Sequence, residues 1–198
     1  MQSRVRIAGW SGDAQAIARI HVDSWQATYG NGLLPRQYLD RLTIAGLTER
    51  WQKRLGQLSR GSPATPAHIA DAYSVWVAEI GDEVVGFAEF GPCTQDPALA
   101  GFAGEVYMLY VHPSAQGRGI GRDLLDCAVA ELAAYSFYWL VIWVVAGNQR
   151  AQAFYRRAGL KSDGARRIDH FAGQSVPVVR YARPLNPIID FDRLFERV

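Results

Sequence analysis

The chain has 198 residues, of which 49% are hydrophobic and 20% charged, and its formal net charge at pH 7 is only +2. A chain of this length buries roughly 70% of the surface that its unfolded form exposes, so one domain is expected. It contains neither an apolar run of the roughly 18 residues that a membrane span needs nor a long block of like charges. We therefore expect no membrane and no nucleic acid among its partners.

The N-terminal residues and the cysteines indicate a cytoplasmic protein. The first residues lack the continuous apolar stretch of a secretory signal. The only cysteines are Cys93 and Cys127, which suggests no disulfide framework.

The first part of the chain predicts a strand followed by helices. Residues 4–9 alternate polar and apolar side chains, as a short edge strand does. A helix with Ile17, Ile20 and Ser24 on one face follows. After a break at residues 31–35, a second helical region runs through Tyr38 and on to Leu58.

The middle of the chain predicts a loop, a hairpin and a buried strand. Residues 61–68 are rich in Pro and small residues, which favours a surface loop. Residues 74–80 and 84–90 are β-rich and flank a short connection that contains glycine, which is typical of a hairpin. Residues 106–111 are apolar on both faces, which indicates a central strand.

The rest of the chain alternates helices and strands. An apolar stripe that begins at Ile120 predicts a helix, and residues 139–145 predict a second strand that is apolar on both faces. Asn148 opens a short helix that Gly159 ends as a left-handed cap. Residues 168–171 and 176–182 predict two further strands. The domain is expected to span residues 1–184, and the tail 185–198 has no assigned role.

A glycine-rich loop, Gln116-Gly117-Arg118-Gly119-Ile120-Gly121, joins the central strand to the helix at Ile120. Its glycines offer unobstructed backbone N–H groups at the positive end of a helix dipole, a geometry that binds phosphate. No lysine follows as a Walker loop requires, and the spacing differs from the Rossmann pattern Gly-x-Gly-x-x-Gly.

The loop resembles the acyl-CoA loop of GNAT acetyltransferases, whose pattern Gln/Arg-x-x-Gly-x-Gly/Ala is met by Gln116, Gly119 and Gly121. A second family region, Asn-x-x-Ala-x-x-Phe-Tyr-x-x-x-Gly, is matched from Asn148 to Gly159. The resemblance implies a single-domain α/β fold with a mixed, mostly antiparallel central sheet flanked by helices. It also implies an N-acetyltransferase that passes an acetyl group from acetyl-CoA to a primary amine by direct attack in a ternary complex.

The same resemblance assigns a binding site for acetyl-CoA as co-substrate. The backbone N–H groups of Leu109 and Val111 would bind the pantetheine arm, and Asn148 would hydrogen-bond it. The loop would hold the pyrophosphate through Gln116, Gly117, Arg118, Gly119, Ile120, Gly121 and Arg122. A basic cluster between residues 150 and 167 either meets the remaining phosphate or is a solvated surface.

Two residues are implied as the acid and the base. Tyr155, which the family often uses to protonate the departing thiolate, is expected both to bind the donor and to act as the acid. Glu105 is the candidate base, with Glu89 or water alone as alternatives. His21, His68, His112 and His170 are scattered without metal-ligand spacing, so no metal is expected.

The acceptor is a small-molecule, peptide or protein amine that the sequence does not specify. Five aromatic residues are candidates to line its pocket: Trp25, Tyr29, Tyr107, Trp143 and Phe171. Two other functions remain open, a non-catalytic acyl-CoA sensor and a binding domain for another phosphorylated nucleotide. Dimers are common among similar proteins, so a homodimer is one possible state, and the sequence does not specify the oligomeric state.

Overall fold

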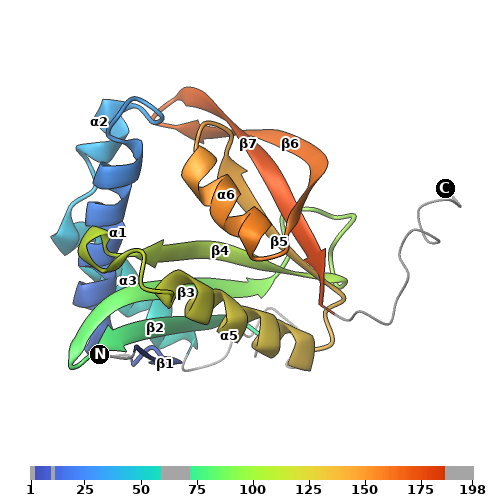
Figure 1. Ribbon diagram of the computed structural model, residues 1–198. Helices are drawn as coiled ribbons and strands as arrows, with labels where there is room; N and C mark the ends of the chain where they lie inside the picture. The colour runs from blue at the N-terminus through green and yellow to red at the C-terminus, as the bar shows by residue number, and fades with distance from the viewer. Residues whose placement is uncertain (1–2, 10–11, 59–71, 186–198) are drawn as a thin grey trace, which may run out of the picture.

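The computed structural model describes residues 3–9, 12–58 and 72–185, which form one seven-stranded sheet with helices on both faces (Figure 1). The elements are, in chain order, β1 (Arg4–Ile7), α1 (Asp13–Tyr29), α2 (Arg36–Leu39), α3 (Ile44–Leu58), β2 (Ser74–Ile80), β3 (Glu83–Pro92), β4 (Ala103–Val111), a 3₁₀ turn (Pro113–Ala115), α5 (Ile120–Ala134), β5 (Trp139–Val145), α6 (Gln149–Arg157), β6 (Lys161–Phe171) and β7 (Gln174–Pro184).

The sheet is mostly antiparallel. Its strand order is β1-β2-β3-β4-β5-β7-β6, and only the central pair, β4 and β5, runs parallel. Parallel neighbours need a long crossover connection, which α5 supplies between these two strands. The predicted mixed α/β fold is confirmed.

The helices divide the core between the two faces of the sheet. Leu124 and Leu132 of α5 and Tyr155 of α6 pack with Val106 and Val144 against one face. On the other face, α1 and α3 cover β2 and β3, while the end of α1 and α2 pack against β5 and β7. Because successive side chains of a strand point to opposite faces, β5 supplies both cores, which explains its uninterrupted apolar sequence.

Two elements differ from the sequence-based expectation. The second helical region is split into α2 and α3, because the chain leaves the helix after Asp40 and Thr43 Oγ1 then accepts the N–H of Gly46 at 3.1 Å, starting a new helix. β6 begins at Lys161 rather than at 168, because its first residues pair with the extended end of β7. The predicted loop 61–68 and nearly all of the tail lie outside the described residues.

Long-range polar contacts fix β1 against the rest of the fold. Arg6 donates to Asp13 at 2.6 Å and to Glu79 at 2.5 Å, which ties β1 to α1 and β2.

Among the described residues, no helix is long and apolar enough to span a membrane.

Candidate active site

The parallel strands β4 and β5 pair only at their beginnings and then separate. Residues 103–105 pair with residues 139–141, although β4 continues to residue 111 and β5 to 145. A β-bulge leaves Tyr107 without a partner in β3, because its neighbours Val106 and Met108 pair with successive residues of that strand. A bulge bends the strand that carries it. The middle of the sheet therefore opens into a V-shaped gap between β4 and β5.

The edge of β4 that borders this gap presents backbone hydrogen-bonding groups. His112 donates its N–H to β3 at 2.8 Å, and the direction of these groups alternates along an antiparallel strand. The N–H groups of Leu109 and Val111 therefore point away from β3 and towards the gap. The Val111 carbonyl accepts the side chain of Gln116 at 2.9 Å, which also fixes the start of the glycine loop.

The glycine loop leaves its backbone accessible at the start of α5. Gly117 has φ 81° and Gly119 φ 86°, a left-handed conformation that favours glycine. A Cβ on either residue would meet no atom within 4 Å. Gly119 is the N-cap of α5 and supplies no side-chain cap. The first N–H groups of this helix are therefore available, with the positive end of the helix dipole, to bind an anion.

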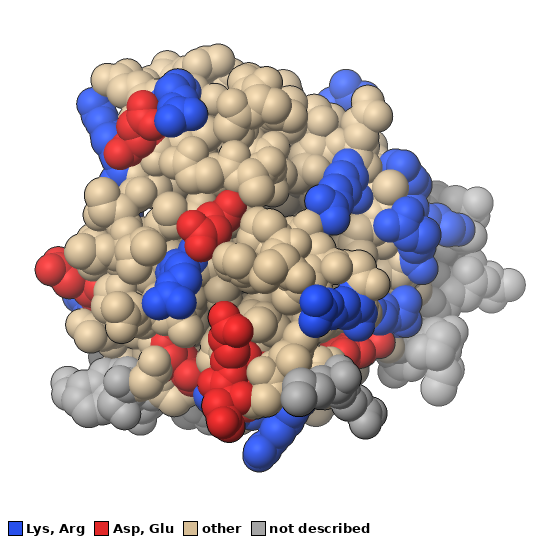
Figure 2. Space-filling view, turned by 60° about the vertical axis from the view of Figure 1, so that its left-hand side comes forward, with Lys and Arg blue, Asp and Glu red and all other residues tan. Residues whose placement is uncertain are grey.

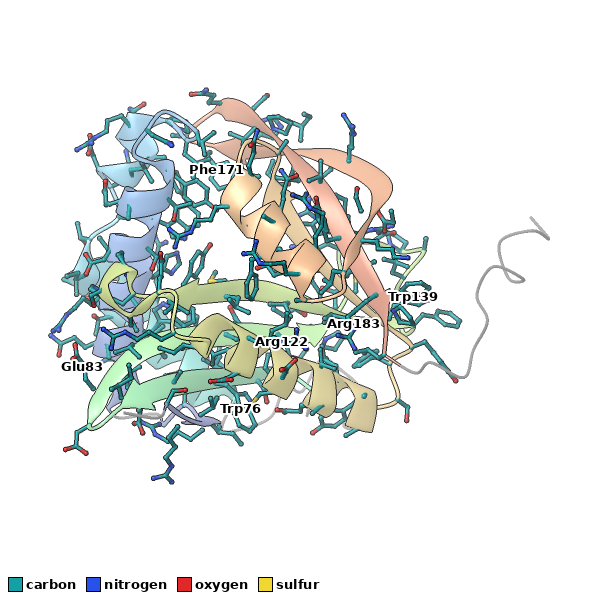
Figure 3. The ribbon with its side chains drawn as sticks, viewed as in Figure 1. Trp76, Glu83, Arg122, Trp139, Phe171 and Arg183 are labelled. Carbon is teal, nitrogen blue, oxygen red and sulfur yellow. The ribbon has the colours of Figure 1, made fainter. Side chains whose placement is uncertain are left out.

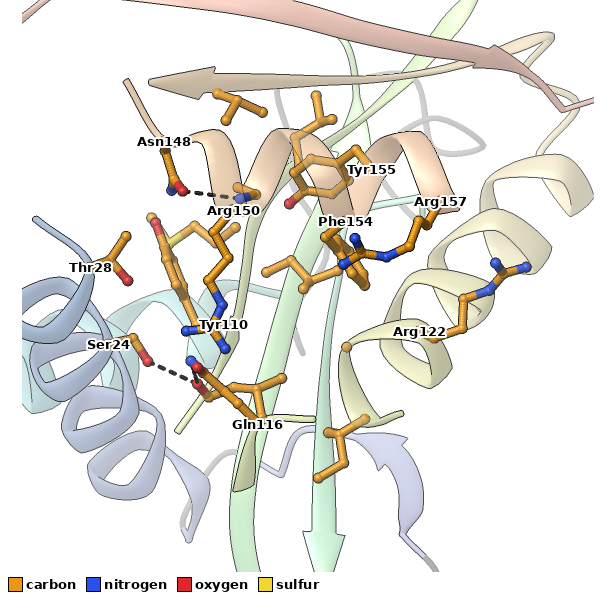
Figure 4. Close-up of a pocket in the computed structure, with 18 of the residues that line it drawn as sticks. Ser24, Thr28, Tyr110, Gln116, Arg122, Asn148, Arg150, Phe154, Tyr155 and Arg157 are labelled. Atoms are coloured by element: carbon orange, nitrogen blue, oxygen red, sulfur yellow. Dashed lines mark hydrogen bonds between the residues drawn. The ribbon is translucent and has the colours of Figure 1, made fainter. Parts of the chain in front are cut away.

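A first cavity of about 520 Å³ lies between the glycine loop, α1, α6 and the diverging strands (Figure 4). Of the residues predicted to bind the donor, all line this cavity except Arg118. The lining also includes Ser24 and Thr28 of α1 and Phe154 of α6, to which the sequence analysis assigned no role in the site.

The cations at the first cavity differ from those that the loop sequence suggests. Arg122 lines it but is paired with Asp126 at 2.8 Å, both about half exposed. Arg118 lies outside the lining and directs Nη2 towards a loop carbonyl at 3.5 Å. Arg150 and Arg157 of α6 also line the cavity, and neither forms an ion pair within the described parts of the chain.

The basic cluster at residues 150–167 is divided among several surroundings. Besides the two arginines at the first cavity, Arg156 donates to the Tyr181 hydroxyl at 3.0 Å. Arg167 lies on β6 and pairs with Asp169. In Figure 2, basic side chains predominate on the right-hand half of the face shown. Only part of the cluster can therefore meet a ligand in the first cavity.

The two predicted residues of α6 have different surroundings. The Asn148 Oδ1 accepts the N–H of Ala151 at 3.0 Å and so caps α6, and the Asn148 side chain also hydrogen-bonds Tyr29 of α1. Tyr155 is buried, with 5% of its surface exposed, and its hydroxyl points into the first cavity (Figure 4). Burial raises the pKa of Tyr155 above its ordinary value, so the hydroxyl keeps its proton.

A second cavity of about 210 Å³ lies on the other side of the gap. All five aromatic residues predicted to contact the acceptor line it, together with Tyr110. Trp25 contacts three of them, with ring centroids 5.3 Å from Tyr29, 6.3 Å from Tyr110 and 6.0 Å from Phe171. Figure 3 shows Phe171 on β6 beside α1. The wall is therefore assembled from residues far apart in the sequence.

Glu105 supplies a buried carboxylate to the second cavity. It is 5% exposed, and its Oε2 has no hydrogen-bond partner among the described residues. Burial raises the pKa of Glu105, an effect that Cys93 and the cations Arg167 and Arg180 oppose. A carboxylate with a raised pKa and an unpartnered oxygen is suited to accept a proton.

Glu89, the alternative base, is already paired. It is also buried, but its carboxylate accepts Arg54 Nε at 2.6 Å, and it lines neither cavity.

The three histidines within the described residues lie outside both linings. His21 is packed in the core, where its ring stacks on Tyr110 at 5.5 Å, and burial lowers its pKa to about 4. His112 contacts Asp23 at 3.3 Å, and His170 is exposed on β6. His68 lies outside the described residues. Within the described ranges, no three His, Cys, Asp or Glu side chains group as metal ligands would.

The two cavities meet at the gap between β4 and β5. They share four lining residues, Tyr29, Tyr107, Tyr110 and Trp143. The Tyr155 hydroxyl lies on the first side of this shared wall and the Glu105 carboxylate on the second. The site can therefore hold two reactants against each other between an acid and a base.

Comparisons with known proteins agree with this architecture. The family model described as "Acetyltransferase (GNAT) family" matches residues 36–160. An uncharacterized N-acetyltransferase of Bacillus subtilis, YuaI, is 32% identical over 139 residues, which are 69% of this chain and 68% of that protein.

Solved structures share the fold. A ribosomal-protein-alanine N-acetyltransferase from Brucella melitensis superposes with a TM-score of 0.69 at 24% identity, covering 91% of this chain and 99% of that one. The PaiA N-acetyltransferase from Thermoplasma acidophilum, solved in complex with coenzyme A, gives 0.66 at 17% identity, covering 91% and 98%.

The chain belongs to the GNAT acetyltransferase family. It is an acetyltransferase, as the two motifs around Gln116 and Asn148 predict.

Proposed function

We propose that this enzyme transfers the acetyl group of acetyl-CoA to a primary amine by direct attack in a ternary complex. The observation that carries the proposal is the meeting of the two cavities at the gap, with Tyr155 lining one and Glu105 the other. Direct transfer needs two reactants held in contact, an acceptor for one proton and a donor of another.

The first cavity suits acetyl-CoA. The accessible N–H groups of the glycine loop and the start of α5 bind the pyrophosphate, and Arg150 and Arg157 add positive charge. The gap edge of β4, with the N–H groups of Leu109 and Val111, hydrogen-bonds the pantetheine arm and polarises the thioester carbonyl.

Glu105 and Tyr155 move the two protons. Glu105 accepts the proton of the amine, directly or through one water, so that the nitrogen lone pair attacks the thioester carbonyl. Tyr155 donates its proton to the sulfur as the carbon–sulfur bond breaks. Burial keeps the Tyr155 hydroxyl protonated, so a proton is available beside the sulfur when the carbon–sulfur bond breaks.

A thiol-release assay with acetyl-CoA and a panel of primary amines, amino acids and peptides tests this function. We expect acceptor-dependent release of free CoA and mass addition of one acetyl group to the acceptor. Calorimetry with acetyl-CoA, ATP and NAD accompanies the assay, and acetyl-CoA should bind most tightly. Tight acetyl-CoA binding without release across the panel would favour a non-catalytic acyl-CoA sensor, and equal affinity for ATP or NAD would favour a general nucleotide site.

A further inference from the structure

The second cavity carries an excess of negative charge. Its lining includes two carboxylates, Glu105 and Asp169, and one cation, Arg167, among the described residues. Arg167 is committed, because Asp169 accepts its Nε at 2.8 Å and its Nη2 at 3.3 Å, while Gln95 accepts Nη1 at 3.2 Å. The Glu105 Oε2 lacks such a partner.

Arg180, the other cation near this cavity, is also ion-paired. Arg180 does not line the cavity but lies 5.4 Å from the Trp143 ring, and its charge acts on Glu105. It pairs with Asp96 at 2.5 Å and with Asp163 at 2.7 Å. Arg167 also stacks on Trp143, at 4.3 Å. The described structure therefore offers a ligand an unpaired carboxylate but no unpaired cation around this cavity.

The remaining wall is apolar and small. Beyond the six aromatic residues, the second cavity is lined by the aliphatic side chains of Leu34, Val106, Val145 and Val178. A cavity of about 150 Å³ lined by apolar side chains is known to hold benzene. The volume of about 210 Å³ thus accommodates one ring or a branched alkyl group with a short amine arm.

We propose that the acceptor is a small primary monoamine with an apolar, ring-sized body and no carboxylate beside its amine. The inference rests on the proposed acetyltransferase function and specifies its substrate class. The ammonium enters beside Glu105, and the body packs against the wall that includes Trp25 and Phe171. An α-amino acid of the same size would bring a carboxylate into a cavity whose cation is already neutralised, and a buried unpaired charge is costly.

The reaction balances with this substrate. The ammonium first gives one proton to solvent through Glu105. The nitrogen of the neutral amine then forms a bond to the acetyl carbon and loses a second proton to Glu105. The carbon–sulfur bond breaks, and the sulfur takes one proton from Tyr155. The products are an N-alkylacetamide and free CoA, after which solvent returns the proton from Glu105 to Tyr155.

Matched pairs of acceptors test the proposal. The pairs are 2-phenylethylamine with L-phenylalanine and isoamylamine with L-leucine, and each pair differs only by the α-carboxylate. We expect kcat/KM to be at least about tenfold higher for each amine, since selectivity against an unpaired charge commonly exceeds that factor. Equal or higher kcat/KM for the amino acids, or turnover of peptides alone, would overturn the proposal while leaving the acetyltransferase function intact.

A substitution at Asp169 checks the charge argument directly. Asp169→Asn keeps the shape but removes the charge that neutralises Arg167, so kcat/KM for L-phenylalanine relative to 2-phenylethylamine should rise about tenfold. Asp163→Asn is the matched control, because it alters a partner of Arg180 that does not line the cavity. An unchanged ratio in Asp169→Asn would contradict the role of the Arg167–Asp169 pair. If the wild-type enzyme acetylates no acceptor of any class, the proposed function fails as well.

Discussion

The two cavities of this enzyme are built in different ways. The first depends on backbone groups supplied by one continuous segment, the end of β4, the glycine loop and the start of α5. The second depends on side chains from α1, the segment before α2, β4, β5, β6 and β7. A site built from backbone groups is insensitive to most side-chain substitutions but sensitive to changes in backbone conformation. A site built from side chains is sensitive mainly to substitutions. Substitutions on the two sides should therefore affect different measurements.

The largest effect is expected at the proposed base, Glu105. Glu105→Gln should lower kcat by about 10³, because positioned proton transfer typically contributes 10²- to 10⁴-fold, with little change in the Kd for acetyl-CoA. Glu89→Gln is the matched control on the neighbouring strand and should change kcat by less than about threefold. Steady-state kinetics and calorimetry measure both. If the two variants lost activity equally, Glu105 would not be the base.

The pH profile provides a second test of the same residue. Burial raises the pKa of Glu105, and a base acts only when deprotonated, so kcat/KM should rise as the pH passes upward through that raised value. This acidic limb should lie above the ordinary glutamate pKa of about 4.3 and should disappear in Glu105→Gln. A limb that survives in the variant would assign the titration to another group.

A smaller loss is expected at the proposed acid, Tyr155. Tyr155→Phe removes only the hydroxyl and should lower kcat by about 10², with the effect largest for acceptors of low reactivity. Tyr181→Phe, which changes a neighbouring buried hydroxyl bound to Gln152, serves as the control. Comparable losses in both variants would indicate a packing defect, which thermal unfolding would reveal.

At the glycine loop the expected effect is on binding. Gly119→Ala forces a side chain into a left-handed conformation and places a methyl group where the phosphate approaches, so the Kd for acetyl-CoA should rise about tenfold. Gly164→Ala is an unusually close control, since both glycines have φ 86° and open space around a Cβ. Each variant should lose about 1 kcal/mol of stability. Only Gly119→Ala should weaken binding, and a shared loss of affinity would contradict the phosphate role.

The smallest effect concerns single surface charges. Arg150→Gln should raise the Kd for acetyl-CoA about threefold and flatten its salt dependence, because exposed charge pairs contribute less than about 1 kcal/mol. Arg118→Gln should change Kd by less than about twofold, since Arg118 lies outside the first cavity. The reverse order of effects would mean that the loop arginine turns inward when the donor binds.

The first cavity was predictable because its signals are local. Glycine positions and helix periodicity follow from neighbouring residues, so the loop, α5 and α6 appear in the sequence at nearly their final bounds. The family motifs then related Asn148 and Tyr155 to the loop. The break between α2 and α3 was missed because its apolar spacing continues across Asp40 and Thr43, whereas the cap that starts α3 depends on a single hydroxyl.

The second cavity was predictable only in part. Its five aromatic residues were proposed through the family resemblance. Tyr110 was not proposed, because it lies in a strand that is apolar on both faces, where the sequence does not distinguish a residue of a cavity wall from a core residue. The roles of Asp169 and Gln95 depend on where β6 begins and how it pairs with β7. Strand register is set by long-range pairing, and the local pattern around residues 161–171 did not reveal it.

The divergence of β4 from β5 also bears on how this enzyme can change during evolution. The donor segment and the β6–β7 hairpin have no lining residue in common, and they meet only through four residues of the shared wall. With the proposed roles of the two cavities, mutations in the hairpin should change acceptor preference without altering the residues proposed to bind acetyl-CoA. Because β4 and β5 separate, acceptor preference should be able to change during evolution while the residues proposed for acetyl-CoA binding stay the same.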